Sequence, residues 1–148
     1  MRLRSLSLLI LVFGVLALAA CGAPTTSSTT PTMPTSATSA GAKTVGQMTV
    51  AELKTQLDAG TKLFLLDVRT PEEFSQDGHV AAATLIPLNE LDVRLKELPT
   101  DTPIACICRS GNRSTTACSD LAARGYTVTN VTGGMNAWGA AGFPIARP

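Results

Sequence analysis

Runs of apolar residues separated by polar segments predict four short strands along this chain. The runs occupy residues 63–66, 84–87, 104–108 and 126–131. In the first and third runs the apolar residues follow one another without polar interruption, which is typical of strands covered on both faces of a parallel sheet. The sequence therefore indicates a sheet whose central strands are buried.

Capping signals and helically spaced apolar residues predict helices between these strands. Thr49 and Glu52 form a capping box at the start of a helix that ends at Gly60. A second, short helix starts with Thr70 as N-cap, Pro71 at the first helical position and Glu73 at the third, which is again a capping-box pattern. Further helices are predicted from a cap at Asn89 with Leu91, Leu95 and Leu98 on one face, over residues 114–124 closed by Gly125, and over residues 133–138.

Strand and helix alternate throughout residues 44–148, which predicts an α/β fold. We expect a sandwich with a central, mostly parallel sheet flanked by helices. In such sheets ligands bind beyond the carboxyl ends of the strands. Asp67 and Arg69 follow one predicted strand, and Cys108 ends another. These polar side chains form a candidate site.

The first twenty residues have the pattern of an export signal. Arg2 and Arg4 precede an apolar run over residues 6–20, which is too short for a comfortable membrane span and suits a signal peptide. The sequence Leu-Ala-Ala-Cys ending at Cys21 resembles the bacterial lipobox. That resemblance implies cleavage before Cys21 and lipid attachment to it. An ordinary signal peptide cut near Ala20, or an uncleaved anchor, is the alternative.

A tether and one folded domain are predicted to follow. Thr, Ser, Pro and Ala dominate residues 23–42, which cannot bury a core. We therefore expect a signal peptide at residues 1–20, a lipidated cysteine with a disordered tether at residues 21–43, and a domain at residues 44–148. Lipid on Cys21 would hold the exported protein on the outer face of a bacterial membrane, in the cell envelope.

Composition excludes one broad class of partner. Without Arg2 and Arg4, ten basic and eleven acidic side chains remain, a net charge of −1, and aromatic residues make up 4% of the chain. There is no basic stripe along the sequence, so nucleic-acid binding is not expected. The domain is long enough for a single core and is expected to be a monomer.

The stretch between the third strand and the next helix carries the main candidate chemistry. It reads Cys108-Arg109-Ser110-Gly111-Asn112-Arg113-Ser114. Backbone N–H groups and the helix dipole at the start of a helix favour negative charge. A thiolate at Cys108 would therefore be stabilised, its pKa would fall, and it would act as a nucleophile at neutral pH. A buried structural cysteine beside a turn is the alternative.

The polar groups around Cys108 suggest supporting roles. Arg109 and Arg113 would attract an anionic substrate, or one of them would pair with Asp67 to hold the loop. Asp67 and Arg69 are interpreted as supporting residues rather than catalytic ones.

The remaining loop residues are expected to shape an anion-binding cradle. The N–H groups of residues 109–114, which include Ser110 and Asn112, would line it. Gly111 would permit the tight backbone path. Ser114 is expected both to hydrogen-bond the thiolate and to cap the helix.

Several short motifs form a pattern across the domain. They lie at residues 66–74, 78–80, 86–88, 108–114, 125–126, 133–138 and 142–144. Together they resemble the single-domain rhodanese family of sulfurtransferases. The resemblance implies a rhodanese-like sandwich. No cofactor is expected, and no metal site is expected because Cys106 and Cys108 lack a convincing second pair of ligands. Glu73 stands where some thiosulfate-using relatives carry an arginine, which leaves the natural donor open.

The resemblance also implies a reaction. Cys108 would take a sulfane sulfur from a donor such as thiosulfate or a persulfide, hold it as a persulfide, and pass it to cyanide or a thiol. Related phosphatase folds have five residues between the cysteine and the arginine of this loop, whereas four separate Cys108 from Arg113, and the smaller ring suits a sulfur atom. A non-catalytic rhodanese-like module that binds a partner or senses thiol oxidation is the alternative.

Four further residues are expected to have structural roles. Cys106 and Cys118 should be buried small hydrophobes. His79, the single histidine of the chain, and Trp138 are assigned to packing.

Overall fold

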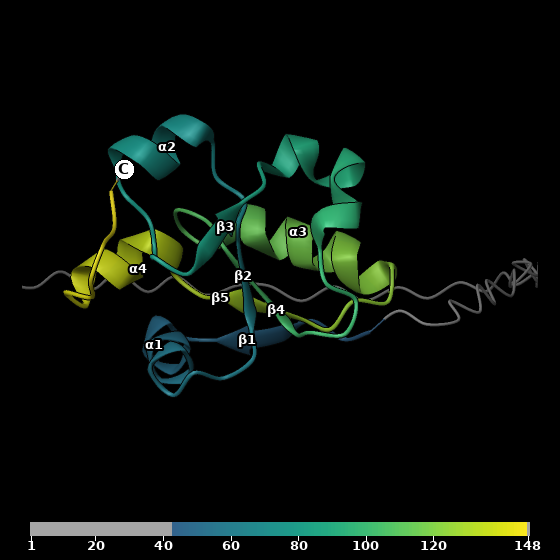
Figure 1. Cartoon of the computed structure of the whole chain (residues 1–148), viewed down its shortest axis with the longest axis horizontal. Helices are drawn as coiled ribbons and strands as arrows, with labels where there is room; N and C mark the ends of the chain where they lie inside the picture. Colours follow the sequence, from purple (N-terminus) through teal and green to yellow (C-terminus); the bar gives the residue numbers. More distant parts are fainter. Residues whose placement is uncertain (1–42, 148) are drawn as a thin grey trace, which may run out of the picture. The chain divides into compact units, whose positions relative to one another are not determined.

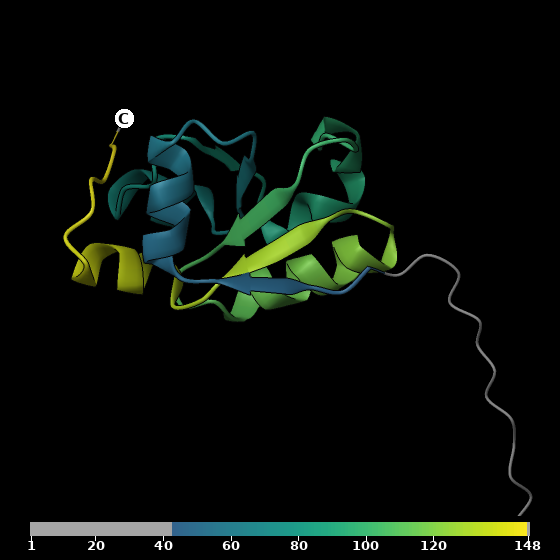
Figure 2. The same ribbon diagram turned by 90° about the horizontal axis from the view of Figure 1, so that it is seen from below.

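A five-stranded sheet forms the centre of the domain. The computed structural model describes residues 43–147. The strands are β1 (Gly46–Met48), β2 (Phe64–Asp67), β3 (Ala83–Leu85), β4 (Ile104–Ile107) and β5 (Val128–Val131). All neighbouring strands pair in parallel, in the order β1-β5-β4-β2-β3 (Figures 1 and 2). The predicted α/β class is confirmed, with a fully parallel sheet.

Helices connect the strands and cover both faces of the sheet. They are α1 (Val50–Asp58), α2 (Pro71–Gln76), α3 (Asn112–Ala123) and α4 (Gly134–Ala140), with two 3-10 helices, η1 (Leu88–Val93) and η2 (Leu95–Glu97). The capping boxes predicted at Thr49 and Thr70 are both present. Within residues 43–147 no helix is long and apolar enough to cross a bilayer.

The predicted helix capped by Asn89 is wrong. The segment forms η1 and η2 instead, and Pro87 precedes η1 without any side-chain cap. The helix is interrupted at Arg94, whose backbone leaves the helical region at φ −109° and ψ 12°. Leu91 and Leu98 are nevertheless both buried in the core. Strand β1 was also not predicted, because three residues with mixed exposure carry little periodic signal.

The alternation of side chains along the strands divides the core into two clusters. Leu65, Ala105 and Ile107 pack with residues of α1 and α4. Leu66 and Cys106 face the other way, and pack with residues of α3 and η1. Figure 2 shows α1 and α3 separated by the sheet. Both sides of β2 and β4 are covered, as the uninterrupted apolar runs indicated.

Helix α4 is fastened to the backbone that follows β4. The N–H of Met135 donates to the Cys108 carbonyl at 2.8 Å, and the N–H of Asn136 donates to the Arg109 carbonyl at 2.9 Å. Gly134 permits this approach because its φ is +53° and a Cβ there would collide with the Cys108 carbonyl oxygen.

Two glycines of α4 should therefore respond in opposite ways to alanine. Gly134→Ala should lower the free energy of unfolding by about 2–4 kcal/mol through strain and collision. Gly139 lies in the same helix and its Cβ would meet no atom within 4 Å, so Gly139→Ala should be neutral or stabilise by about 0.5–1 kcal/mol. Urea denaturation of both variants measures the difference. Equal stability of the two variants would contradict the close docking of α4.

Candidate active site

The parallel sheet brings the predicted site residues to one edge. Strands β2 and β4 are hydrogen-bonded neighbours, and Asp67 pairs in register with Ile107. The residues that follow the two strands therefore leave the sheet side by side. Cys108 comes directly after β4 and lies four residues before the start of α3 at Asn112. The nucleophile candidate thus sits at the N-terminal end of a helix, as the sequence predicted.

Cys108 lies in a cradle of hydrogen-bond donors. The N–H of Gly111 donates to Cys108 Sγ at 3.1 Å, and Ser114 Oγ lies 3.5 Å from the same sulfur. Burial by itself raises the pKa of the Cys108 thiol, since the residue is 1% exposed. The Ser114 hydroxyl and the N–H groups of Ser114, Gly111 and Ser110 outweigh burial, so the pKa is lowered below that of an ordinary cysteine.

Gly111 makes the turn into α3. Its φ of +102° is in the region that favours glycine, and it forms the N-cap of the helix without any side-chain hydrogen bond. The prediction that Ser114 caps the helix is therefore wrong. Because α3 begins two residues before Ser114, this serine lies inside the first turn, with Oγ 3.0 Å from the Gly111 carbonyl oxygen. Its predicted contact with the Cys108 sulfur is present.

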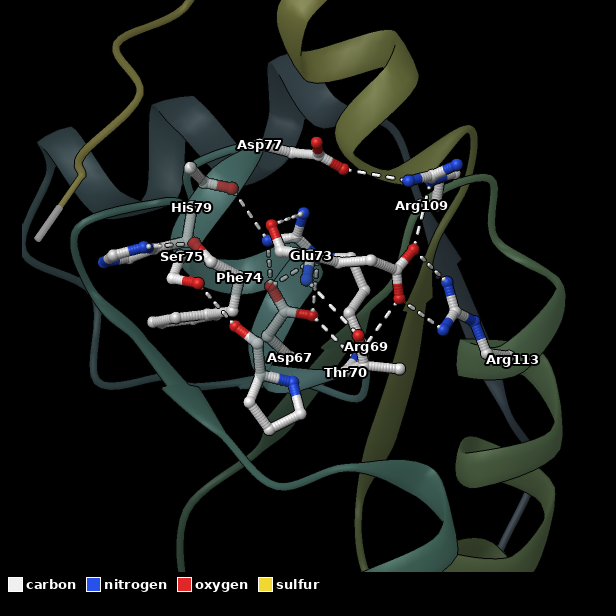
Figure 3. A network of polar contacts seen from close by, with 12 residues as sticks. Asp67, Arg69, Thr70, Glu73, Phe74, Ser75, Asp77, His79, Arg109 and Arg113 are labelled. Atoms are coloured by element: carbon white, nitrogen blue, oxygen red, sulfur yellow. Dashed lines mark hydrogen bonds and ion pairs between the residues drawn. The ribbon is translucent and has the colours of Figure 1, made fainter.

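The two loop arginines are held by acidic residues of α2 and its C-cap. Both nitrogens at the tip of Arg113 donate to Glu73, Nη1 to Oε2 at 2.6 Å and Nη2 to Oε1 at 2.8 Å. Arg109 Nε lies 3.1 Å from Glu73 Oε1, and Arg109 Nη2 lies 2.9 Å from Asp77 Oδ2 (Figure 3). The hydrogen bonds from Arg113, with smaller help from Thr70 and Arg109, lower the pKa of Glu73 to about 2.

Arg113 joins this acidic partner to the nucleophile. Its pKa is raised, first by Glu73 and in smaller part by charge and hydrogen bonding with the Cys108 sulfur. The guanidinium group therefore stabilises negative charge on the sulfur while it remains paired with Glu73. The alternative that a loop arginine pairs with Asp67 is wrong, because Asp67 has another partner.

Asp67 forms a buried ion pair with Arg69. The two side chains are 0% and 1% exposed, and Arg69 Nη2 lies 2.7 Å from Asp67 Oδ2. Arg69 also donates to the Gly78 carbonyl at 2.9 Å and to the Glu73 carbonyl at 3.4 Å, and its guanidinium carbon lies 5.9 Å from the centre of the Phe74 ring. Asp67 and Arg69 therefore make the contacts of supporting residues: through them α2 is fastened to the end of β2.

The remaining predicted residues lie around this centre or outside the described part of the chain. Ser110 and Asn112 have exposed side chains, and Ser110 acts on Cys108 through its backbone N–H. Cys106 and Cys118 are fully buried; the contact with Cys118, together with burial, raises the pKa of the Cys106 thiol. The lipid-attachment residue, Cys21, lies outside the described residues.

His79 and Trp138 make the packing contacts expected of structural residues. The His79 ring stacks on Phe74 with ring centroids 3.7 Å apart, and its Nδ1 lies 3.1 Å from the Phe74 carbonyl oxygen. Trp138 is 2% exposed, donates from Nε1 to the Pro144 carbonyl at 2.9 Å, and meets Phe143 edge to face.

Sequence reasoning missed the acidic partners of the two loop arginines. The predicted capping box already identified Glu73 as the N3 residue of α2, and its Oε2 does accept from the Thr70 N–H at 3.1 Å. The same carboxylate also faces α3, which only the packing of α2 beside the loop reveals. Asp77 was not considered, because nothing in its sequence surroundings distinguishes it from a solvated side chain.

Ser114→Ala should move the reactivity of Cys108 to higher pH. The reactive thiolate forms as the pH rises through the pKa, and the lowered pKa places the midpoint of alkylation by iodoacetamide below that of an ordinary cysteine. Loss of the Ser114 hydroxyl removes one stabilising contact, so the midpoint should rise. Ser110→Ala keeps its backbone N–H and should leave the midpoint unchanged. Equal midpoints in wild type and Ser114→Ala would contradict this role of the hydroxyl.

Comparison with known proteins identifies relatives of this chain. The family model described as Rhodanese-like domain matches residues 49–141. The chain is 36% identical over 105 residues to a sulfurtransferase of Allochromatium vinosum, which covers 70% of this chain and 97% of that protein. It is 35% identical over 94 residues to the putative sulfurtransferase YtwF of Bacillus subtilis, covering 64% of this chain and 90% of that protein.

A solved structure agrees with these matches. The crystal structure of a rhodanese-related protein from Thermoplasma volcanium has a TM-score of 0.65 and 32% identity, and the match covers 70% of this chain and 99% of that one. The predicted rhodanese-like sandwich is therefore confirmed. The relatives named as sulfurtransferases support sulfur transfer in general and a rhodanese-type enzyme at the level of the family. On this fold, this loop and these matches, the chain belongs to the rhodanese-like domain family.

Proposed function

We propose that this protein transfers sulfane sulfur through a persulfide on Cys108. The donor is a small sulfur-containing anion such as thiosulfate, or a persulfide, and the acceptor is a thiol or cyanide. The donors aimed at the Cys108 sulfur, the Gly111 N–H at 3.1 Å and the Ser114 hydroxyl at 3.5 Å, support this most directly, and they lower the pKa of the thiol. A thiolate is the form that attacks a sulfane sulfur.

Each step conserves sulfur and electrons. The Cys108 thiolate bonds to the sulfane sulfur of thiosulfate, the sulfur–sulfur bond of the donor breaks, and sulfite leaves with that electron pair. In the second step the acceptor bonds to the outer sulfur, the bond from that sulfur to Cys108 Sγ breaks, and Cys108 regains its thiolate. No external oxidant or reductant is needed.

Residues of the loop would stabilise the anionic intermediate. The N–H groups of Ser110, Gly111 and Ser114 are directed at Sγ, where they offset negative charge. Arg113 adds a fixed positive charge while Glu73 holds its position. Their role is electrostatic, because donors around the sulfur favour the thiolate, and the proposed mechanism uses no separate general base.

Incubation with a sulfane donor should add the mass of one sulfur atom to the protein. Intact mass spectrometry, followed by peptide mapping, should place the added sulfur on Cys108 after treatment with thiosulfate, polysulfide or glutathione persulfide. The Cys108→Ser variant should gain nothing, because the attacking thiolate is absent. A wild-type protein that takes up no sulfur from any of the three donors would contradict the proposal. If it instead formed a sulfenic acid or disulfide at Cys108 under mild peroxide, thiol sensing would explain the loop better.

We further propose that the protein is exported and held at the outer face of a bacterial membrane by lipid on Cys21. The support is the basic, apolar and Leu-Ala-Ala-Cys pattern of the first 21 residues. The following Thr-, Ser- and Pro-rich stretch would act as a spacer. A single copy carries every group of the proposed reaction, which is consistent with a monomer.

Cys21→Ser should release the protein from membranes when the chain is expressed in a bacterium. The substitution removes the thiol that would carry the acyl chains, whose burial provides the attachment. Fractionation into membrane and soluble material measures the effect. Cys118→Ser serves as the matched control and should stay with the membrane fraction. Retention of the Cys21→Ser variant on the membrane would contradict lipid anchoring.

A further inference from the structure

The carboxylate of Glu73 occupies the place where the loop would bind an oxyanion. Arg113 presents the two nitrogens at its tip side by side, a geometry that matches the paired oxygens of an oxyanion. Both nitrogens already donate to Glu73, at 2.6 and 2.8 Å. Arg109 Nε lies 3.1 Å from the same carboxylate, so Glu73 lies between the two arginines (Figure 3). Its side chain is 16% exposed and is largely enclosed by these contacts.

The second loop arginine is occupied as well. Arg109 Nη2 lies 2.9 Å from Asp77 Oδ2. The two arginines and the two carboxylates thus carry two positive and two negative charges. The thiolate of Cys108 adds a negative charge to this balanced group. A donor with two negative charges would therefore meet no net positive charge at the loop.

Glu73 is fixed both in charge and in place. The hydrogen bonds from Arg113 lower the pKa of Glu73 to about 2, so the carboxylate is charged throughout the neutral range. Its own helix holds it too, because Oε2 accepts from the Thr70 N–H at 3.1 Å. An oxyanion that replaced Glu73 would have to break its contacts with Thr70, Arg109 and Arg113.

Glu73 influences the nucleophile through Arg113. Arg113 lies in the first turn of α3, directly before Ser114, whose Oγ is 3.5 Å from Cys108 Sγ. The pKa of Arg113 is raised by Glu73 first and by the Cys108 sulfur in smaller part, so the guanidinium group faces both. A donor whose sulfane sulfur reaches Sγ would place its other atoms beside this guanidinium group.

A mainly apolar cavity beside Arg113 can hold a donor group that carries no charge. Its volume is about 370 Å³, and Val68, Pro87 and Leu88 provide apolar walls. Val68 and Cys108 directly follow the paired ends of β2 and β4, and both pack in the same core cluster. The wall of the cavity therefore includes the immediate neighbour of Cys108 and the arginine that acts on its sulfur.

We propose that Glu73 determines donor specificity: it excludes dianions such as thiosulfate and selects a sulfane-sulfur donor with a single negative charge and a small apolar group, such as an alkyl persulfide or thiosulfonate. The apolar group would lie in the cavity beside Arg113. With a thiosulfonate, the Cys108 thiolate bonds to the sulfane sulfur, the sulfur–sulfur bond of the donor breaks, and the sulfinate leaves with that electron pair. This assignment rests on the proposed persulfide chemistry.

Thiosulfate and methanethiosulfonate form a matched pair of donors, because a methyl group in the second replaces one charged oxygen of the first. Intact mass spectrometry of the full-length protein measures the rate at which each donor loads sulfur on Cys108. Each rate is divided by the rate of the same donor with a free thiol. Wild type should then favour methanethiosulfonate about tenfold, as expected for the loss of one charge-assisted contact to the dianion.

Glu73→Gln should shift this donor ratio toward thiosulfate about tenfold, because the neutral amide frees the arginines for the oxygens of the donor. Glutamine also retains the capping interaction at this helical position. Glu52→Gln is the matched control, since Glu52 has the same capping role at Thr49 in α1, on the other face of the sheet. It should leave the ratio unchanged.

Alkylation tests the role of Glu73 without any sulfur transfer. Iodoacetate and iodoacetamide have the same size and differ by one negative charge. The ratio of their rates at Cys108, followed by mass spectrometry, cancels any change in the amount of thiolate. Glu73→Gln should raise the relative rate of iodoacetate about tenfold. Glu73→Asp, which keeps the charge, should hold that rate low, and Glu52→Gln should behave as wild type.

A larger apolar group on the donor tests the cavity. Benzenethiosulfonate has the same charge as methanethiosulfonate and should load sulfur severalfold faster, after division by the rates with a free thiol. Leu88→Ala should reduce this gain, because it removes an apolar wall. Leu95→Ala is the matched control, since Leu95 is also partly buried against the same core cluster but does not line the cavity.

The failures of the two proposals are distinguishable. A protein that loads sulfur on Cys108, but whose donor and alkylation ratios are the same in wild type and Glu73→Gln, would overturn the role of Glu73 and leave the persulfide chemistry intact. An equal gain from the phenyl group in wild type and Leu88→Ala would overturn the assignment of the cavity. A wild-type protein that no donor loads would overturn the persulfide chemistry and the donor assignment together.

Discussion

The buried ion pair between Asp67 and Arg69 is the contact on which the architecture of the site depends. Both side chains are removed from water, and loss of either partner would leave an unpaired buried charge at a cost of about 3–5 kcal/mol. Arg69 extends from the end of β2 to the Glu73 carbonyl within α2 and to the Gly78 carbonyl just after that helix. The pair thereby fixes the position of α2, and α2 carries the carboxylate that holds the loop arginines.

Cys108 shows how burial and hydrogen bonding compete at a single sulfur atom. Burial disfavours the thiolate, but donors from the start of α3 and the Ser114 hydroxyl more than offset it. The position arises from the parallel sheet, because a strand end and the following helix start must meet at one edge. Arg113 then connects the sulfur to Glu73, so the electrostatics of the nucleophile depend on α2 as well as on its own loop.

Local patterns predicted most of the fold but not the pairing within the site. The capping boxes at Thr49 and Thr70 involve residues three apart, and the buried strands are runs of four residues, so both can be identified from the sequence. The contact between Glu73 and Arg113 joins residues 40 apart. Whether Arg113 meets Glu73 or Asp67 depends on how α2 packs beside the sheet. No spacing along the chain encodes that choice.

The structure of the protein after treatment with polysulfide would test the central claim most directly. A crystal structure at high resolution should show one additional sulfur atom bonded to Cys108 Sγ, within hydrogen-bond distance of loop N–H groups, with the Arg113–Glu73 contact preserved. An unmodified Cys108 after such treatment, or sulfur added only at Cys106 or Cys118, would contradict a loop built to carry sulfur.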